Sequence, residues 1–261
     1  MNCLVETALL THGLRSITNE ELAQSWHCPD AILAWVDRGE LKLGPIGEYL
    51  PFRERSEELI RIDCDHLEEA LQTGASGALT ASGTMAVCRR LDIPMAITCG
   101  MGGIGDLRGE ELCPDLPALM NIPVALISTS PKDMLDRPAT LDWLRRHGVH
   151  TAGEPCTGYL FCGEPVALEL PLSSCNNEAA VRHLTANGGL LLLNPIPEKE
   201  RVQDRSILVD AIKAGKQAEA EGHYYHPAAN GEIDRRTGGY SSRIQLESIQ
   251  QNYLLAKSIM D

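Results

Sequence analysis

Short apolar runs that alternate with amphipathic stretches limit this chain to one class of fold. Residues 95–99, 124–128 and 190–193 are almost entirely apolar, which is typical of strands buried on both faces. Residues 177–185 and 207–220 show helical periodicity instead. Because alternation of this kind favours parallel connections, we predict an α/β fold with a mostly parallel sheet and helices on both faces, an α/β/α sandwich.

The length and composition favour one globular domain. A chain of 261 residues with 43% hydrophobic content can bury one large core, so we expect a single domain over residues 1–261. No apolar run approaches the roughly 20 residues that a membrane-spanning helix needs. The N-terminus also lacks a basic segment followed by an apolar one. We therefore expect a cytoplasmic protein without a membrane partner.

The charge and the cysteines narrow the choice of partner and compartment. A formal net charge of −13 argues against a nucleic-acid partner, because binding to its backbone depends on clustered lysines and arginines. A phosphorylated small molecule remains suitable, since a local anion site needs only a few donors. The nine cysteines are scattered and form no Cys-x-x-Cys pair, so we expect free thiols.

Local signals mark where several elements begin and end. We expect a short strand over residues 3–10, followed by the polar Thr11-His12-Gly13 as a candidate edge of a ligand site. Thr18 with Glu21 three residues later is typical of a helix N-terminus, because each side chain can cap the other's backbone N–H. Gly74 is expected to end the helix that precedes it.

A glycine-rich segment follows the strand expected at residues 95–99. Gly100, Gly102 and Gly105 satisfy the Gly-x-Gly-x-x-Gly pattern of dinucleotide sites. A dinucleotide fold also needs an Asp or Glu at the end of the next strand, and here that strand ends in residues 128–130, Ser-Thr-Ser. A nicotinamide cofactor is therefore disfavoured, although the glycines would let backbone N–H groups approach an anion.

Three ionisable residues stand close to expected strand or helix ends. Lys132 follows the strand at residues 124–128, Glu6 belongs to the first strand, and Asp115 closes Cys113-Pro114-Asp115. Position alone leaves two interpretations open for each of these residues. Lys132 is either a solvated lysine or an amine catalyst, Glu6 a strand-end carboxylate or a proton donor, and Asp115 a helix cap or a site residue.

The order of several segments resembles the pseudouridine-5′-phosphate glycosidase family. The matching segments are residues 6–13, 77–85, 100–109 and 187–198. The last is the most specific, because it contains Asn-Gly-Gly-Leu and Asn-Pro-Ile-Pro-Glu, and Thr-Gly-Gly at residues 237–239 adds the family's C-terminal landmark. The resemblance spans nearly the whole chain.

The resemblance implies an enzyme that breaks the C–C bond between C1′ of ribose and the base of pseudouridine 5′-phosphate, or of a related C-nucleoside phosphate. The products would be the base and ribose 5-phosphate, and such pseudouridylate synthases are classed with the hydro-lyases. Because this bond has no good leaving group, a lysine Schiff base on the opened ribose would supply the electron sink. A C-glycoside synthase and a non-catalytic phosphosugar-binding homologue remain as alternatives.

The resemblance also assigns roles to individual residues. Lys132 would form the Schiff base, Glu6 would donate a proton, and Asp115 would lie beside the substrate. The substrate-binding positions that it implies are Arg61, Ala81, Thr98, Arg108, Cys113, Pro114, Asp115 and Asn194. Glu111 falls on, or one residue from, a metal-binding aspartate, so a divalent cation such as Mn²⁺ is implied. A homo-oligomer, commonly a trimer, is implied as well.

Three positions depart from the family's pattern. Arg61 replaces a substrate-binding lysine, which keeps the charge but changes a compact ammonium into a forked guanidinium. Leu107 replaces a histidine and removes a donor. A late active-site asparagine is matched by Arg243 or by Gln245, depending on the alignment. The predicted catalytic groups are therefore kept while the residues that would contact the substrate are altered.

Overall fold

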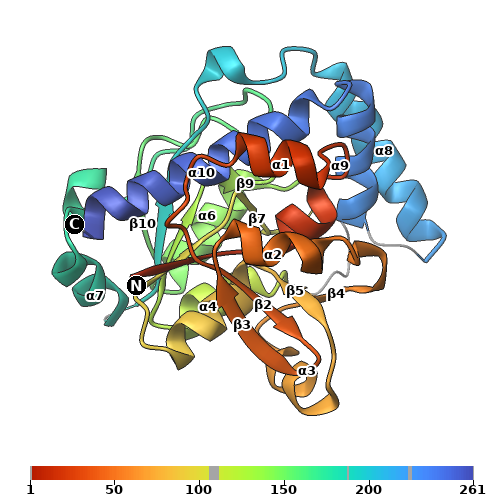
Figure 1. The fold of residues 1–261 in the computed structure, drawn as a ribbon. Coiled ribbons are helices and arrows are strands. Elements are labelled where there is room, and N and C mark those ends of the chain that lie inside the picture. The colour runs from red at the N-terminus through yellow and green to blue at the C-terminus, as the bar shows by residue number, and fades with distance from the viewer. Residues whose placement is uncertain (1, 106–111, 187, 223–224, 261) are drawn as a thin grey trace.

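A twisted, mostly parallel sheet with helices on both faces forms the core of the computed structural model (Figure 1). The structure describes residues 2–105, 112–186, 188–222 and 225–260. The strands of the main sheet are β1 (Cys3–Val5), β2 (Leu33–Asp37), β3 (Glu40–Gly44), β4 (Ile60–Ile62), β5 (Gly77–Leu79), β6 (Met95–Ile97), β8 (Ala125–Ser128), β10 (His150–Gly153) and β11 (Leu190–Leu193). Their order is β10-β11-β8-β6-β1-β2-β5-β4, and β3 pairs with β2.

The direction of pairing confirms the predicted parallel sheet and adds one antiparallel feature. All neighbours from β10 to β2 are parallel. The β2–β3 hairpin and the β2–β5 pair are antiparallel. Arg38 and Gly39 link β2 to β3 with φ of 54° and 74°, the left-handed backbone that a two-residue hairpin turn requires. A second, two-stranded parallel sheet joins β7 (Gly100–Met101) to β9 (Ser130–Pro131).

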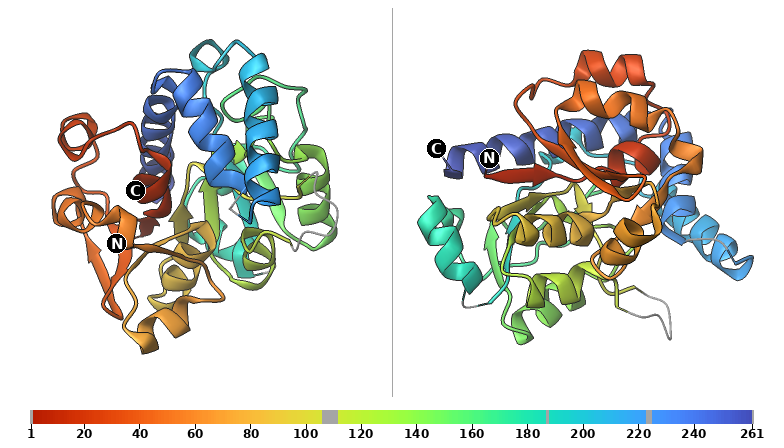
Figure 2. Two further views of the ribbon diagram at one scale, coloured as in Figure 1. Left: turned by 90° about the vertical axis from the view of Figure 1, so that its right-hand side faces the viewer. Right: turned by 60° about the horizontal axis from the view of Figure 1, so that its bottom comes forward.

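Two hydrophobic clusters, one on each face of the sheet, explain where the helices lie. The helices are α1 (Asn19–Ser25), α2 (Ile46–Arg53), α3 (Leu67–Thr73), α4 (Ala81–Arg90), α5 (Asp115–Asn121), α6 (Arg137–Arg146), α7 (Glu178–Ala186), α8 (Ser206–Ala220), α9 (Tyr225–Arg236) and α10 (Tyr240–Met260). Val5 and Ile97 face the cluster that contains α10, whereas Leu4 and Ala96 face the cluster of α4 and α5. In the views of Figure 2, α10 and α4 accordingly lie on opposite sides of the sheet.

The predicted helix boundaries near the N-terminus are confirmed. Thr18 caps α1, and the Thr18 hydroxyl and the Glu21 carboxylate accept each other's backbone N–H as expected. Gly74 ends α3 in the left-handed conformation, with φ of 75°. All nine cysteines are free thiols. Among the described residues, no helix combines the length and the apolar composition needed to cross a membrane.

The expected strand over residues 3–10 is wrong beyond its first half. β1 ends at Val5, and Leu9–Gly13 form a short π-helix, η1. Thr7 ends the strand because its hydroxyl donates to the Ala34 carbonyl at 2.8 Å and accepts the Leu79 N–H at 3.0 Å. These contacts tie Thr7 to β2 and to β5, so the chain turns away from the sheet directly after Glu6.

We expect Arg53 to be essential for the stability of η1. Its buried guanidinium donates to the carbonyls of Leu10 (2.6 Å), Leu14 (3.0 Å) and Ile17 (2.7 Å), and to Asn19 Oδ1 (2.5 Å). Replacing Arg53 with Met should lower the free energy of unfolding by about 3–5 kcal/mol, because buried acceptors lose a charged donor. Urea unfolding measures this, with the exposed Arg15→Met as control. Equal stability of the two variants would contradict the assignment.

Candidate active site

A polar pocket opens where the carboxyl ends of the central strands meet. It contains about 440 Å³ of space not occupied by protein atoms. The lining residues are Glu6, Ala8, Leu9, Gly13, Arg61, Thr80, Ala81, Gly100, Asp115, Lys132, Tyr159, Asn230 and Gln245. The pocket therefore brings together the three predicted catalytic residues and, besides Asp115, two further predicted substrate-binding residues, Arg61 and Ala81. This location is the one expected for ligand sites in parallel α/β sheets.

Lys132 is placed by the small β7–β9 sheet. It directly follows β9, and its backbone N–H donates to the Met101 carbonyl of the paired strand at 3.2 Å. Burial lowers the pKa of the Lys132 ammonium, and the positive charge of Arg61 lowers it further. The negative charge of Glu6 acts in the opposite direction but does not cancel these effects. A larger share of Lys132 is therefore the neutral, nucleophilic amine near neutral pH.

The pKa of Glu6 is shifted in the opposite direction to that of Lys132. Only 6% of Glu6 is exposed to solvent, and burial raises the pKa of its carboxyl from 4.5 to about 7. The Thr98 hydroxyl and the Lys132 charge both favour the ionised form, without overcoming burial. Thr98 Oγ1 itself is buried and has no hydrogen bond of regular geometry within the described residues. Glu6 thus keeps a proton near neutral pH, as a general acid requires.

Asp115 connects the start of α4 to the glycine-rich segment that follows β7. As the first residue of α5, it accepts the N–H of Ser82 on Oδ1 at 3.1 Å and the N–H of Gly102 on Oδ2 at 2.8 Å. Its charge favours the ammonium of Lys132. Cys113 packs beside it, and burial raises the pKa of that thiol to about 12, so the thiol stays protonated. Pro114 stands at the N-cap position of α5.

The glycine-rich segment serves close packing of the protein itself. A Cβ on Gly100 would lie 2.6 Å from the Tyr159 ring, and one on Gly103 would lie 2.5 Å from Thr140 Oγ1. The N–H of Gly102 is bonded to Asp115, and that of Ile104 donates to Thr140 Oγ1 at 2.9 Å. These N–H groups therefore have protein acceptors in place of the anion that the glycines suggested.

We expect Gly102→Ala to disrupt the pocket. A Cβ at Gly102 would lie 1.9 Å from Cys113 Sγ and 3.1 Å from Asp115 Oδ2. Because both side chains are short and Asp115 is buried, Asp115 must shift, and we expect kcat/KM to fall by about 10²-fold. Steady-state kinetics measures the loss, with Gly47→Ala as control because a Cβ there meets nothing within 4 Å. Full activity of the Gly102 variant would show that the position of Asp115 is unimportant.

The remaining predicted residues lie elsewhere. Asn194 does not line the pocket; its amide donates to Asn252 Oδ1 at 3.0 Å, and the Asn252 amide donates to the Thr98 carbonyl at 2.7 Å. Asn194 thus connects a strand end to α10. The predicted substrate residue Arg108, the predicted metal residue Glu111 and the altered Leu107 lie outside the described residues. Within the described part of the chain, no group of three or more His, Cys, Asp or Glu is arranged to hold a metal ion.

Sequence reasoning missed three polar lining residues and left a fourth ambiguous. Of the two candidates for the late asparagine, Gln245 lines the pocket while Arg243 is exposed. Gln245 Oε1 accepts the Tyr159 hydroxyl at 2.8 Å, and its amide donates to the Ser241 carbonyl at 3.2 Å. Tyr159, Thr80 and Asn230 were not predicted, because no local pattern marks residues that meet only through tertiary packing.

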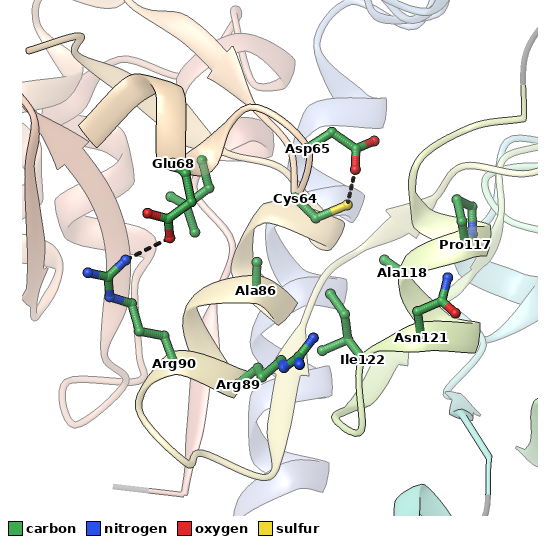
Figure 3. Close-up of a pocket in the computed structure, with 11 residues that line it drawn as sticks. Cys64, Asp65, Glu68, Ala86, Arg89, Arg90, Pro117, Ala118, Asn121 and Ile122 are labelled. Carbon is green, nitrogen blue, oxygen red and sulfur yellow. Dashed lines mark hydrogen bonds and ion pairs between the residues drawn. The ribbon is translucent and has the colours of Figure 1, made fainter. Parts of the chain in front are cut away.

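A larger pocket lies between α3, α4 and α5 (Figure 3). Its lining residues are Cys64, Asp65, Leu67, Glu68, Ala86, Arg89, Arg90, Pro117, Ala118, Asn121 and Ile122. Arg90 is paired with Glu68 at 2.8 Å, and none of the residues predicted to be catalytic reaches this pocket. The smaller polar pocket is therefore the candidate active site.

Comparison with known proteins finds similar sequences over nearly the whole chain. The family model described as "Indigoidine synthase A like protein" matches residues 4–260. The chain is 27% identical to a pseudouridine-5′-phosphate glycosidase of Methylobacterium nodulans over 98% of this chain and 81% of that protein. It is 28% identical to one of Saccharopolyspora erythraea, over 98% and 90%.

Solved structures share the fold at lower identity. One is the prealnumycin C-glycosynthase AlnA in complex with ribulose 5-phosphate, with a TM-score of 0.77, 22% identity and coverage of 98% of this chain and 91% of that chain. Another is an indigoidine synthase A-like protein of Thermotoga maritima, with a TM-score of 0.73, 18% identity and the same coverage. Both confirm the α/β architecture over almost the whole chain.

Proposed function

Because the chain belongs to the family of indigoidine synthase A like proteins, we propose that it cleaves the C1′–base bond of pseudouridine 5′-phosphate or of a related C-nucleoside phosphate. One observation carries the proposal: an amine with a lowered pKa and a carboxyl with a raised pKa, Lys132 and Glu6, face the same pocket. Opposite shifts of this kind supply a nucleophile and a general acid at one pH.

In the first step the neutral Lys132 Nζ attacks C1′ of the bound nucleoside. The C1′–O4′ bond breaks, its electron pair stays on O4′, and a proton from the amine ends on that oxygen. The ribose is then open and joined to the protein by a C1′–N bond. Arg61 also lines the pocket, and its guanidinium would hold the 5′-phosphate so that C1′ faces the amine.

In the second step Glu6 protonates the base at the carbon that was bonded to C1′. The C1′–C bond breaks, its electrons remain with the base, and the nitrogen lone pair forms an iminium between Lys132 and C1′. Water then adds to the iminium, which returns Lys132 as an amine, returns a proton to Glu6 and releases ribose 5-phosphate. Each bond that forms is matched by one that breaks.

The reverse direction is the second candidate. Ribose 5-phosphate would form the iminium with Lys132 and release water, and a nucleophilic carbon of the incoming base would attack C1′. O4′ would then displace the lysine nitrogen from C1′, which closes the ribose of the C-nucleoside phosphate and returns Lys132 as an amine. The likeness to a C-glycosynthase solved with a pentulose phosphate supports this alternative. The third candidate, a phosphosugar-binding homologue without activity, would bind ribose 5-phosphate equally well when Lys132 is replaced by Ala.

Further properties implied by the resemblance belong to the same proposal. They are a divalent cation such as Mn²⁺ held by Glu111, assembly into a homotrimer, and a cytoplasmic location. The described residues offer no complete set of ligands for the cation, so no step above depends on it. Chelation followed by Mn²⁺ addition tests the cation, and light scattering tests the trimer.

A panel of C-linked and N-linked nucleoside 5′-phosphates, assayed with Mn²⁺ for release of ribose 5-phosphate, tests the proposed function. We expect turnover of C-linked substrates alone, and formation of the C–C bond when ribose 5-phosphate and base are supplied in excess. Release from N-linked nucleotides only, or release from none together with no synthesis, would overturn the proposal.

A further inference from the structure

Three side chains where α9 packs against η1 carry buried atoms without a hydrogen-bond partner among the described residues, and one of the three, Asn230, lines the pocket. The atoms are His226 Nδ1 and Asn230 Oδ1 of α9, and His12 Nδ1 of η1, against which α9 packs. His226 and Asn230 are four residues apart, so they lie on the same face of the helix. We call His12, His226 and Asn230 the acceptor wall. Buried polar atoms are almost always paired in folded proteins, so this concentration points to a ligand.

The ionisation state of the wall limits what that ligand can be. Burial, with the charges of Lys132 and Arg61, lowers the pKa of His226 to about 3. Burial likewise lowers the pKa of His12. Both imidazoles are therefore neutral near neutral pH. Because the wall carries no positive charge, it offers little attraction to a second anion beside the 5′-phosphate.

The hydrogen-bonding sense of two of the three atoms is also defined. His12 Nε2 lies 3.0 Å from the Leu59 carbonyl, which can only accept, so this nitrogen carries the proton and Nδ1 has the free lone pair. Asn230 Oδ1 is an acceptor as well. Two unpaired acceptors require N–H or O–H donors from the ligand, and a phosphate dianion has none.

The base of a C-nucleoside meets this requirement better than the base of an ordinary nucleoside. A pyrimidine joined to ribose through carbon keeps both of its ring N–H groups, whereas a pyrimidine joined through nitrogen loses one. An excess of acceptors would therefore favour the C-linked base. The unpaired atoms are closed to water in the free protein, so the Asn230 and His226 side chains must turn towards the pocket that Asn230 already lines.

We propose that His226 and Asn230 of α9, with His12, read the ring N–H groups of the departing base and so determine specificity for C-linked nucleotides. This inference rests on the proposed function and names residues that select its substrate. The wall recognises the heterocycle, while Lys132 and Arg61 engage the sugar phosphate. Loss of the wall should change which base is accepted without changing capture of ribose 5-phosphate.

Calorimetric titration with free uracil and with 1,3-dimethyluracil tests the inference on the intact chain. We expect the protein to bind uracil about tenfold more tightly than the dimethyl analogue, because the analogue lacks both N–H donors. Asn230→Leu and His226→Phe should remove that preference while the affinity for ribose 5-phosphate stays within about twofold. Gly231→Ala is the control, since a Cβ there meets nothing within 4 Å and the substitution leaves the neighbouring Asn230 in place.

The outcomes separate this inference from the function itself. A wild-type preference for uracil that disappears in both variants supports the acceptor wall, even if no nucleotide of the panel is turned over. If the wild type binds uracil and 1,3-dimethyluracil equally well, the inference is wrong. If the variants keep the preference for uracil, these residues serve helix packing and the inference is wrong. If the variants keep that preference and bind ribose 5-phosphate more weakly, the residues contact the sugar, and the inference is wrong as well.

Discussion

Replacing Lys132 with Ala is expected to reduce kcat by on the order of 10⁴-fold or more, because a covalent nucleophile has no substitute in the pocket. Lys132 is the amine whose pKa the site lowers, and the other predicted groups, Glu6 and Asp115, are carboxyls. The substrate should still bind, since Arg61 and the acceptor wall are intact. Stopped assays for ribose 5-phosphate release, together with a separate measurement of substrate Kd, distinguish lost chemistry from lost binding.

Trapping gives the same prediction a chemical readout. Incubation with ribose 5-phosphate followed by borohydride should leave a reduced adduct on Lys132, located by mass spectrometry of peptides. Lys199→Ala, at a lysine whose side chain is 83% exposed, is the matched control and should be trapped like the wild type. If Lys132→Ala still yields the adduct, another amine carries the reaction and the mechanism proposed above is wrong.

The fold was predictable where burial is continuous along a strand. The apolar runs around β6, β8 and β11 have no polar face, and each of these strands has a parallel neighbour on both sides. The π-helix η1 was not predictable, because it depends on Thr7 bonding to Ala34 and on Arg53 reaching Leu10 from 43 residues away. Contacts of that range leave no periodic trace in a local window.

The residues of the site likewise fall into those that could be predicted from the sequence and those that could not. Lys132 and Glu6 follow strands that the sequence marks, so their convergence at one edge of a parallel sheet could be expected. The pocket wall from α9 could not, because residues 223–240 show no clear periodicity. Asp115 illustrates a third case: the resemblance placed it beside the substrate, but its two bonds to backbone N–H groups of Ser82 and Gly102 were not predicted. Its catalytic role stays a prediction.

Arg61 illustrates how a single departure can be useful to the site. Its charge contributes to lowering the pKa of Lys132 and of His226, so it keeps both the amine and the imidazole closer to neutrality. A lysine in its place would carry the same charge on a compact ammonium, whereas Arg61 carries it on a planar, forked guanidinium. The substitution therefore preserves the electrostatic condition for an amine nucleophile while changing the geometry offered to a phosphate.

Replacing Glu6 with Gln is expected to lower kcat by about 10²–10⁴-fold, because the base loses its proton donor. The pH profile should change in a defined way. In the wild type the donor is the protonated carboxyl, whose pKa burial raises to about 7, so activity should fall as pH rises through 7. The Gln variant has no proton to lose, and this basic limb should disappear from its residual activity.

The acidic limb should remain where it is. Activity falls at low pH because Lys132 becomes charged. Glu6 is protonated and uncharged in that range, as the Gln amide is, so the acidic limb of the Gln variant should lie at the same pH as that of the wild type. Profiles of kcat/KM from pH 5 to 9 measure both limbs, and Glu20→Gln at an exposed carboxylate should leave them unchanged.

Stability gives an independent check on the same carboxyl. A group whose folded-state pKa is raised stabilises the protein fully below its unfolded pKa, near 4.5, and that contribution is lost as pH rises through about 7. The wild type should therefore lose on the order of 3 kcal/mol relative to Glu6→Gln between pH 4.5 and pH 8. Urea unfolding at the two pH values measures the difference. An equal difference in the free energy of unfolding between wild type and variant at both pH values would mean that Glu6 ionises in the folded protein as freely as in water. A carboxyl of that kind could not hold the proton that the departing base requires.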